Sequence, residues 1–286
     1  MPERLNLSFD FDADANKNTE KICEDLFYTE RNMAHLRRGI TALNAGKGKE
    51  HEVLAAEDNG AIPNEDRPRR SGGFGMELLL VSYLAGTKTI TANYLSKLSS
   101  KTITFIPTAG NVEPYTGFID EGIAMLEDLG YQLQMLDIAK VEEPVLIQEL
   151  ESAACVCISG GNTFYLLQEL KKKHLTELLA RRIREGMFYI GESAGAIIAA
   201  PDIEYNQIMD DKTLAPDLTD YSALSVFDHS VLPHLGEFPF ETSSRETLER
   251  YRNSLKLIPL NNHEAVLVND RGYTVLCETS PEGSSL

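Results

Sequence analysis

Two thirds of the way along, the chain reads Gly191-Glu192-Ser193-Ala194-Gly195-Ala196, between short apolar runs at 187–190 and 197–200. This order predicts a buried strand, an abrupt turn with Ser193 at its apex, and a helix. Flanking glycines let the backbone bend sharply and leave the serine hydroxyl exposed where the helix begins, next to free N–H groups that favour an oxyanion. The stretch is typical of a nucleophilic serine, although a G-x-S-x-G string also arises by chance in Gly/Ala-rich turns.

The chain from Met76 onward alternates apolar runs with amphipathic stretches. Runs without strict apolar–polar alternation indicate strands that are buried on both faces, as in a parallel sheet covered by helices. The sequence therefore predicts an α/β fold with a doubly wound, mostly parallel sheet. The expected strands are 78–81, 102–106, 133–136, 155–158 and 188–190, and the expected helices include 118–129 and 175–184.

Composition limits the class of protein. Of the 286 residues, 42% are hydrophobic and 25% are charged, which is ordinary for a globular protein with a substantial core. No apolar run approaches the roughly 18–20 residues that span a bilayer, and the first residues are too polar for a signal peptide. A net charge of −17 argues against nonspecific binding to nucleic acid or to anionic membranes. We therefore expect a cytoplasmic protein.

The four cysteines lack the spacing of metal ligands, and Cys155 and Cys157 fall within an expected buried strand. Reduced structural thiols are their expected state. No pattern in the chain indicates a metal or a cofactor, so none is expected.

A second strand-to-helix turn, Gly160-Gly161-Asn162-Thr163, follows the expected strand 155–158. In an open α/β sheet such a turn lies at the carboxyl edge of the strands, where ligands bind. Its backbone N–H groups could donate to a developing oxyanion together with the N–H of Ala194. A plain turn in which Asn162 or Thr163 caps the next helix explains the same residues equally well.

A serine nucleophile needs a general base, because a free hydroxyl is a weak nucleophile near neutral pH. His234 ends an apolar stretch some 41 residues beyond Ser193 and is the favoured base. The other histidines lie in polar surroundings or in an expected turn; they are His35, His51, His174, His229 and His263.

Together these elements resemble the peptidase E/cyanophycinase family of serine peptidases, which includes the aspartyl dipeptidases. The resemblance covers residues 76 to about 276 and rests on five segments that occur in the family's order. They are Met76–Tyr83, Ile103–Gly110, Gly160–Phe164, Gly191–Ala196 and Leu232–His234.

The resemblance implies a flavodoxin-like fold related to the class I glutamine amidotransferases. It also implies that Ser193 is the nucleophile, that His234 is the base, and that the N–H groups of Gly161 and Ala194 form an oxyanion hole. The implied activity is that of a dipeptidase-like exopeptidase that hydrolyses small peptides, with an N-terminal aspartate as one candidate feature of the substrate.

The residue that orients His234 is left open by the resemblance. In peptidase E relatives a carboxylate falls in the late turn that corresponds to 260–265, and the aligned residue here is Asn262. An asparagine can still accept from the imidazole N–H, but it stabilises the imidazolium less well than a carboxylate does. Glu264 is the first acidic candidate and Asp210 the second, with Asp211 as a further alternative.

An anionic substrate side chain would need a cationic partner, and Lys212, Arg245 and Arg252 are candidates that no motif marks. Glu192 directly precedes Ser193, and a carboxylate facing the site would disfavour an acidic substrate. A related peptidase with another specificity is therefore nearly as well supported. An esterase or lipase shares the serine turn, but the usual Ser…Asp…His order would require Asp210 or Asp211 as the acid.

Residues 1–75 differ in character from the rest of the chain. Residues 59–75 are rich in Asn, Gly, Pro and Ser and are expected to link an extension at 1–58 to the α/β domain at 76–286.

Within the extension, residues 27–54 resemble the tail of RelB-type antitoxins. Leu36, Ile40 and Leu43 fall at helical spacing and could fit a partner's groove, or the helix could dock on the peptidase domain. The alternative function is therefore a catalytically weakened binding or regulatory protein whose N-terminal helix engages a toxin-like partner. A small peptide is the other expected partner, and a homodimer is left open.

Overall fold

The computed structural model of the protein describes residues 75–278. The strands within this range are β1 Glu77–Val81, β2 Thr102–Ile106, β3 Gln132–Met135, β4 Cys155–Ile158, β5 Phe188–Glu192, β6 Ser230–Leu232, β7 Leu257–Pro259, β8 Glu264–Asn269 and β9 Gly272–Cys277. The α-helices are α3 Lys88–Leu95, α4 Gly117–Asp128, α5 Glu143–Ser152, α6 Thr163–Lys172, α7 Thr176–Arg184, α8 Ala194–Ile197 and α9 Glu241–Tyr251. Short 3₁₀ helices are η1 Ala85–Thr87, η2 Thr108–Val112, η3 Glu204–Ile208 and η4 Lys212–Leu214.

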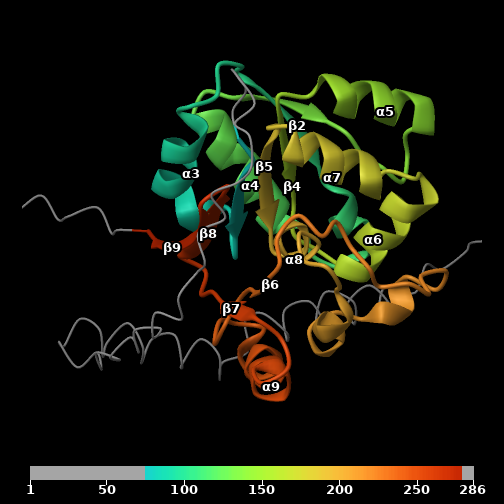
Figure 1. The fold of residues 1–286 in the computed structure, drawn as a ribbon, viewed down its shortest axis with the longest axis vertical. Helices are drawn as coiled ribbons and strands as arrows, with labels where there is room; N and C mark the ends of the chain where they lie inside the picture. Colours follow the sequence, from blue (N-terminus) through green and yellow to red (C-terminus); the bar gives the residue numbers. More distant parts are fainter. Residues whose placement is uncertain (1–74, 279–286) are drawn as a thin grey trace, which may run out of the picture. The chain divides into compact units, whose positions relative to one another are not determined.

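Seven strands form the central sheet, in the order β3-β2-β4-β5-β1-β8-β9 (Figure 1). The strands from β3 to β1 in this order are parallel, and β8 and β9 extend the sheet beyond β1 in antiparallel pairing. Strands β6 and β7 form a separate parallel pair. The predicted α/β class with a mostly parallel sheet is confirmed.

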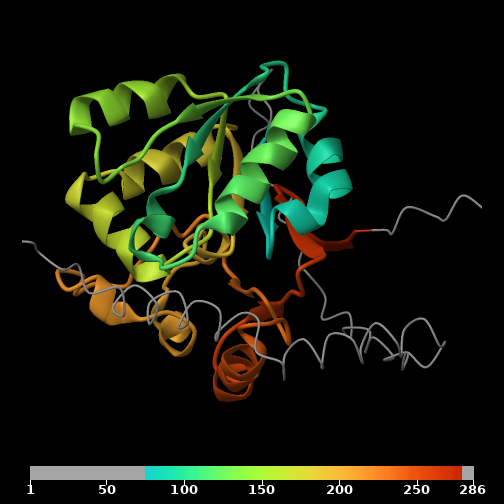
Figure 2. The ribbon, with the colours of Figure 1, turned by 180° about the vertical axis from the view of Figure 1, so that it is seen from behind.

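Helices cover both faces of the sheet (Figures 1 and 2). On β1, Leu78 and Leu80 belong to the core that packs against α5, α6, α7 and α8. Leu79 and Val81 point to the opposite face and belong to the core under α3 and α4. Because successive side chains of a strand alternate between faces, a strand covered on both sides needs apolar residues throughout. This burial explains the continuous apolar runs in the sequence.

The parallel arrangement determines where the site lies. Parallel strands end at the same edge of a sheet, so the segments that follow β1, β4 and β5 meet there. These segments begin with Ser82, Ser159 and Ser193. The turn after β6 reaches the same edge, where the His234 N–H donates to the Ser82 Oγ at 2.8 Å.

Several expectations concern residues outside the described range. The extension at 1–58, the linker at 59–75 apart from Gly75, and the antitoxin resemblance at 27–54 remain predictions. Within residues 75–278, no helix is long and apolar enough to cross a membrane, and no group of three or more His, Cys, Asp and Glu side chains could hold a metal. In β4, Cys155 and Cys157 are buried free thiols, as expected.

Candidate active site

Ser193 lies at a sharp turn between β5 and α8, where the sequence predicts it. Its backbone has φ 46° and ψ −102°, a combination that residues other than glycine rarely adopt. The turn is so tight that a Cβ on Gly191 would lie 2.4 Å from the carbonyl oxygen of Gly195. The Ser193 N–H donates to the Val81 carbonyl at 3.0 Å, which ties the turn to β1. The tight turn and its hydrogen bond to β1 thus hold the backbone of Ser193 in a strained conformation. In this conformation the serine is half-buried at the sheet edge.

The imidazole of His234 lies between Ser193 and Asn262. Nε2 is 2.9 Å from the Ser193 Oγ, and Nδ1 is 2.7 Å from the Asn262 Oδ1. An amide oxygen only accepts hydrogen bonds, so Nδ1 carries the proton and Nε2 is free to accept the proton of the serine hydroxyl. Phe240 stacks on the ring at a centroid distance of 4.8 Å and fixes its plane.

The imidazole of His234 is neutral over a wide pH range. Burial lowers its pKa to about 4, and the hydrogen bond to Asn262 acts in the opposite direction. Its hydrogen-bond partners among residues 75–278 are Ser193, Asn262 and Ser82, none of which carries a charge. A neutral imidazole is the form that can accept a proton as a general base.

Sequence reasoning missed Ser82, which is fully buried directly after β1. Its Oγ accepts from the His234 N–H and donates to the Asn262 Oδ1 at 3.1 Å. Because the hydroxyl has one proton, this donation favours the amide orientation in which the oxygen faces the histidine. The signal in the sequence was the position of Ser82 at the end of a buried strand. Its contact with Asn262 spans 180 residues and could not be inferred.

The acidic candidates for the third position do not lie at the histidine. Glu264 accepts from the Asn261 N–H at 2.8 Å, inside the turn that precedes β8. Asp210 accepts from the Thr163 N–H at 2.7 Å, and Asp211 accepts from the Thr213 N–H. The expectation that Glu264 or Asp210 orients His234 is corrected: the residue at Nδ1 is Asn262.

The turn formed by Gly160 and Gly161 runs beside Ser193. A Cβ on Gly160 would lie 3.4 Å from the Ser193 Cβ. Gly161 has φ 126°, and a Cβ there would lie 2.3 Å from the carbonyl carbon of Ala109. Glycine is therefore required at position 161, both by the backbone conformation and by the close approach of η2.

The N–H groups of Gly161 and Ala194 donate no hydrogen bond to any of the described residues. Asn162 caps α6 by accepting from the Tyr165 N–H at 2.9 Å, which is one of the two predicted alternatives for this turn. The cap therefore satisfies the start of α6 and leaves the Gly161 N–H uncommitted.

Glu192 points into the protein and not toward the site. Its Oε1 accepts from the Leu84 N–H at 2.8 Å, and its Oε2 accepts from the Gly160 N–H at 3.1 Å. Burial raises the pKa of this carboxyl to about 7, and the two N–H donors act to lower it. The expectation that Glu192 would oppose an acidic substrate group is corrected, because the side chain is 2% exposed.

Of the cationic candidates, Arg245 of α9 lies beside the turn that carries His234. Its Nη2 would be 3.5 Å from a Cβ on Gly236. Lys212 donates to the side chain of Gln207 at 3.2 Å, and Arg252 follows the end of α9. The structure thus places one cationic side chain, Arg245, against the loop of the candidate base.

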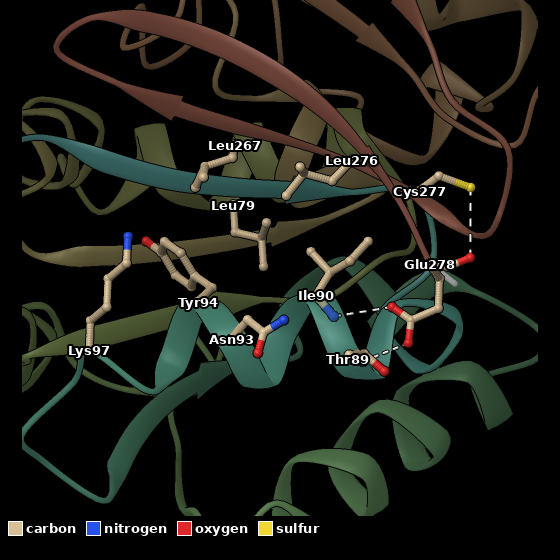
Figure 3. A pocket seen from close by; sticks show the side chains of 10 residues that line it. All are labelled: Leu79, Thr89, Ile90, Asn93, Tyr94, Lys97, Leu267, Leu276, Cys277 and Glu278. Carbon is tan, nitrogen blue, oxygen red and sulfur yellow. Dashed lines mark hydrogen bonds between the residues drawn. The ribbon is translucent and has the colours of Figure 1, made fainter. Parts of the chain in front are cut away.

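A separate cavity of about 320 Å³ lies between α3 and the sheet (Figure 3). Its apolar floor comes from β1, β8 and β9. Glu278 closes one end by accepting from the N–H groups of Thr89 and Ile90 at 2.7 and 3.1 Å. Neither Ser193 nor His234 lines this cavity, so it is distinct from the candidate active site.

The described part of the chain is similar to known peptidases. Residues 78–276 match the model of peptidase family S51. The uncharacterized peptidase Lin0382 of Listeria innocua is 40% identical over 193 residues, which cover 68% of this chain and 92% of that protein. Peptidase E of Salmonella typhi is 31% identical over 191 residues, which cover 64% of this chain and 79% of that protein. A crystal structure of a Listeria monocytogenes EGD-e protein, provisionally designated peptidase E, is 36% identical with a TM-score of 0.68 and covers 71% of this chain and 98% of its own.

Proposed function

Because this chain belongs to peptidase family S51, and is a peptidase by that membership, we propose that it is a serine exopeptidase of dipeptidase type. The observation that carries the proposal is the series of contacts from the Ser193 Oγ through the imidazole to the Asn262 Oδ1, at 2.9 and 2.7 Å. These are the contacts that a nucleophile, a general base and an orienting group must make.

In the proposed reaction the Ser193 Oγ attacks the carbonyl carbon of the scissile peptide bond while the His234 Nε2 takes the hydroxyl proton. The N–H groups of Gly161 and Ala194 hold the oxyanion that forms. His234 then gives the proton to the leaving amine, and the C–N bond breaks to leave an acyl-enzyme. Water attacks the ester in the same way, which releases the acid and restores the hydroxyl of Ser193.

Asn262 has the role that a carboxylate usually has. Its amide oxygen keeps the proton on Nδ1, so the tautomer needed for base catalysis is set without a charge. The imidazolium that forms during the reaction receives less stabilisation than a carboxylate would give. More of the transition-state stabilisation must therefore come from the oxyanion donors.

We extend the proposal to peptides with an N-terminal aspartate. The support is the guanidinium of Arg245 beside the His234 loop, together with the inward direction of Glu192, whose carboxylate is held by two backbone N–H groups and does not face a substrate. A substrate carboxylate could pair with Arg245 in a charge-assisted hydrogen bond.

Labelling with a fluorophosphonate probe, followed by a panel of Asp-X and Ala-X dipeptides, tests the function. We expect the probe to label Ser193 in the wild type and not in Ser193→Ala, and we expect Asp-X to be cleaved faster than Ala-X. Ser254→Ala, which removes an exposed hydroxyl three residues beyond the end of α9, is the matched control and should label normally. Full peptide hydrolysis by Ser193→Ala would overturn the proposal, and labelling without dipeptide cleavage would point to another acyl substrate.

The charge state of His234 gives an independent prediction. Asn262→Asp places a carboxylate at Nδ1, which favours the imidazolium, so the pKa of His234 should rise from about 4 to between roughly 5 and 7. The imidazole ¹⁵N shifts, followed by NMR as a function of pH, measure this change. Asn261→Asp adds the same charge one residue away and should move the pKa less. An unchanged pKa in Asn262→Asp would show that residue 262 does not contact the imidazole in solution.

A further inference from the structure

Glu192 is a buried carboxyl group for which the proposed reaction has no role. It ends β5, directly before Ser193, and its two oxygens accept from two different loops of the sheet edge. One loop follows β1 and contains Ser82 and Leu84. The other follows β4 and contains Gly160 and Gly161. A single side chain thus joins the two loops that flank the serine.

We propose that Glu192 is a positioning residue whose ionised carboxylate holds the Gly160–Gly161 turn in register with Ser193. This inference rests on the proposed function, since it assumes that Ser193 is the nucleophile and that the Gly161 N–H binds the oxyanion. Glu192 acts through the backbone and does not touch the substrate.

Geometry supports this role on both sides of the serine. The N–H that Glu192 holds belongs to Gly160, the residue next to the proposed oxyanion donor, and a Cβ on Gly160 would be 3.4 Å from the Ser193 Cβ. On the other side, the carboxylate holds Leu84, two residues beyond the Ser82 hydroxyl that contacts His234 and Asn262. A displacement of about 1 Å in such a site can lower the rate about a hundredfold.

The chemistry of the contact favours the ionised form. Both partners of Glu192 are N–H donors, and a carboxylate has acceptors for both. A protonated carboxyl has one O–H, so one of its two oxygens becomes a poorer acceptor and one of the two hydrogen bonds is weakened. Glutamine loses that acceptor altogether, because its NH₂ group only donates. Glu192→Gln therefore removes at least as much of this contact as protonation of the wild type does.

The groups around Glu192 determine where this protonation takes place. Glu121 of α4, which accepts from Tyr83, disfavours a second negative charge at Glu192, whereas the nearby thiol of Cys157 in β4 is neutral because burial raises its own pKa. Burial and, to a smaller extent, Glu121 raise the pKa of Glu192 to about 7, whereas that of His234 lies at about 4. A loss of activity between pH 8 and 6 would thus not arise from protonation of the base.

The second-order rate constant for fluorophosphonate labelling of the full chain, measured from pH 5.5 to 8.5, tests the inference. In the wild type we expect it to fall about tenfold from pH 8 to pH 6, following the ionised fraction of a group with a pKa near 7. Glu192→Gln should label at least about tenfold more slowly than the wild type at pH 8 and show no step in this range. Peptide hydrolysis should show the loss in kcat with KM little changed.

Two further variants separate a positioning role from a structural one. Glu192→Asp keeps the charge and should restore part of the rate together with a pH step. Asp210 is the competing group, because burial raises its pKa to about 6 and it holds the Thr163 N–H. Asp210→Asn should retain the wild-type step.

Each outcome decides the question. A Glu192→Gln variant with the wild-type rate and step, or a step that disappears in Asp210→Asn instead, would overturn the positioning role while leaving the proposed function intact. A wild type that is neither labelled nor active on peptides would overturn the proposed function and this inference with it. If Glu192→Gln fails to fold, the pH profiles of labelling for the wild type, Glu192→Asp and Asp210→Asn still show whether Glu192 has the positioning role.

Discussion

Alanine at His234 should lower kcat/KM for peptide hydrolysis about a million-fold, as much as alanine at Ser193 does. The reason is the 2.9 Å contact between the His234 Nε2 and the Ser193 Oγ. Without the imidazole the hydroxyl keeps its proton, and without the hydroxyl the base has nothing to activate. The measurement is kcat/KM for the best dipeptide of the panel, with active-site titration to exclude traces of wild type.

The double variant is the sharper test of this pairing. If the two residues act as a unit, Ser193→Ala with His234→Ala should be no slower than either single variant, because each change alone already removes the shared step. Additive losses would show that the two side chains act independently. His174→Ala removes an exposed histidine between α6 and α7 and should leave kcat/KM unchanged, as a control for nonspecific effects.

Alanine at Gly161 should affect both activity and stability. At φ 126° the new Cβ would be 2.3 Å from the carbonyl carbon of Ala109, so the backbone must move and carry the Gly161 N–H with it. Loss of one oxyanion donor lowers kcat about 10²–10³-fold. Positive φ alone costs on the order of 1–3 kcal/mol, and the collision with η2 adds to that cost. Steady-state kinetics and urea unfolding measure the two effects.

The matched control for this substitution is Gly272→Ala. Gly272 has φ 132°, nearly the same conformation, but nothing lies within 4 Å of the position that its Cβ would take. Its free energy of unfolding should therefore fall by the strain alone, and kcat should stay near the wild-type value. Equal stability losses in the two variants would contradict the close approach of η2 to Gly161.

The sheet could be predicted because burial on both faces requires continuous apolar runs, which are easily recognised in the sequence. The runs 102–106 and 155–158 agree with β2 and β4 residue for residue, and 133–136 differs from β3 by one residue. Strands β8 and β9 were not anticipated. Strand β9 is largely exposed and so lacks the buried apolar run that identified the parallel strands. Strand β8 does contain an apolar run, Ala265–Val268, but this run was not assigned to a strand from the sequence.

The site was predictable where its signal is local. Ser193 could be identified from the glycines on either side of it, and His234 from its position after an apolar run. The choice between Asn262 and Glu264 depends on how a turn directs side chains two residues apart. Glu264 is drawn to the Asn261 N–H, which leaves Asn262 facing the imidazole. The inward direction of Glu192 depends on two loops that only the fold brings together.

Contacts over long sequence separations also have a consequence during synthesis. The Ser82 Oγ meets the Asn262 Oδ1 across 180 residues, and β1 pairs with β8. A nascent chain that has already made Ser193 and His234 therefore lacks the group that sets the imidazole tautomer. Domains fold as units as they emerge from the ribosome, so the imidazole of His234 should be oriented as a base only after Asn262 and β8 have been translated. Until then, the incomplete chain should not hydrolyse peptides near the ribosome.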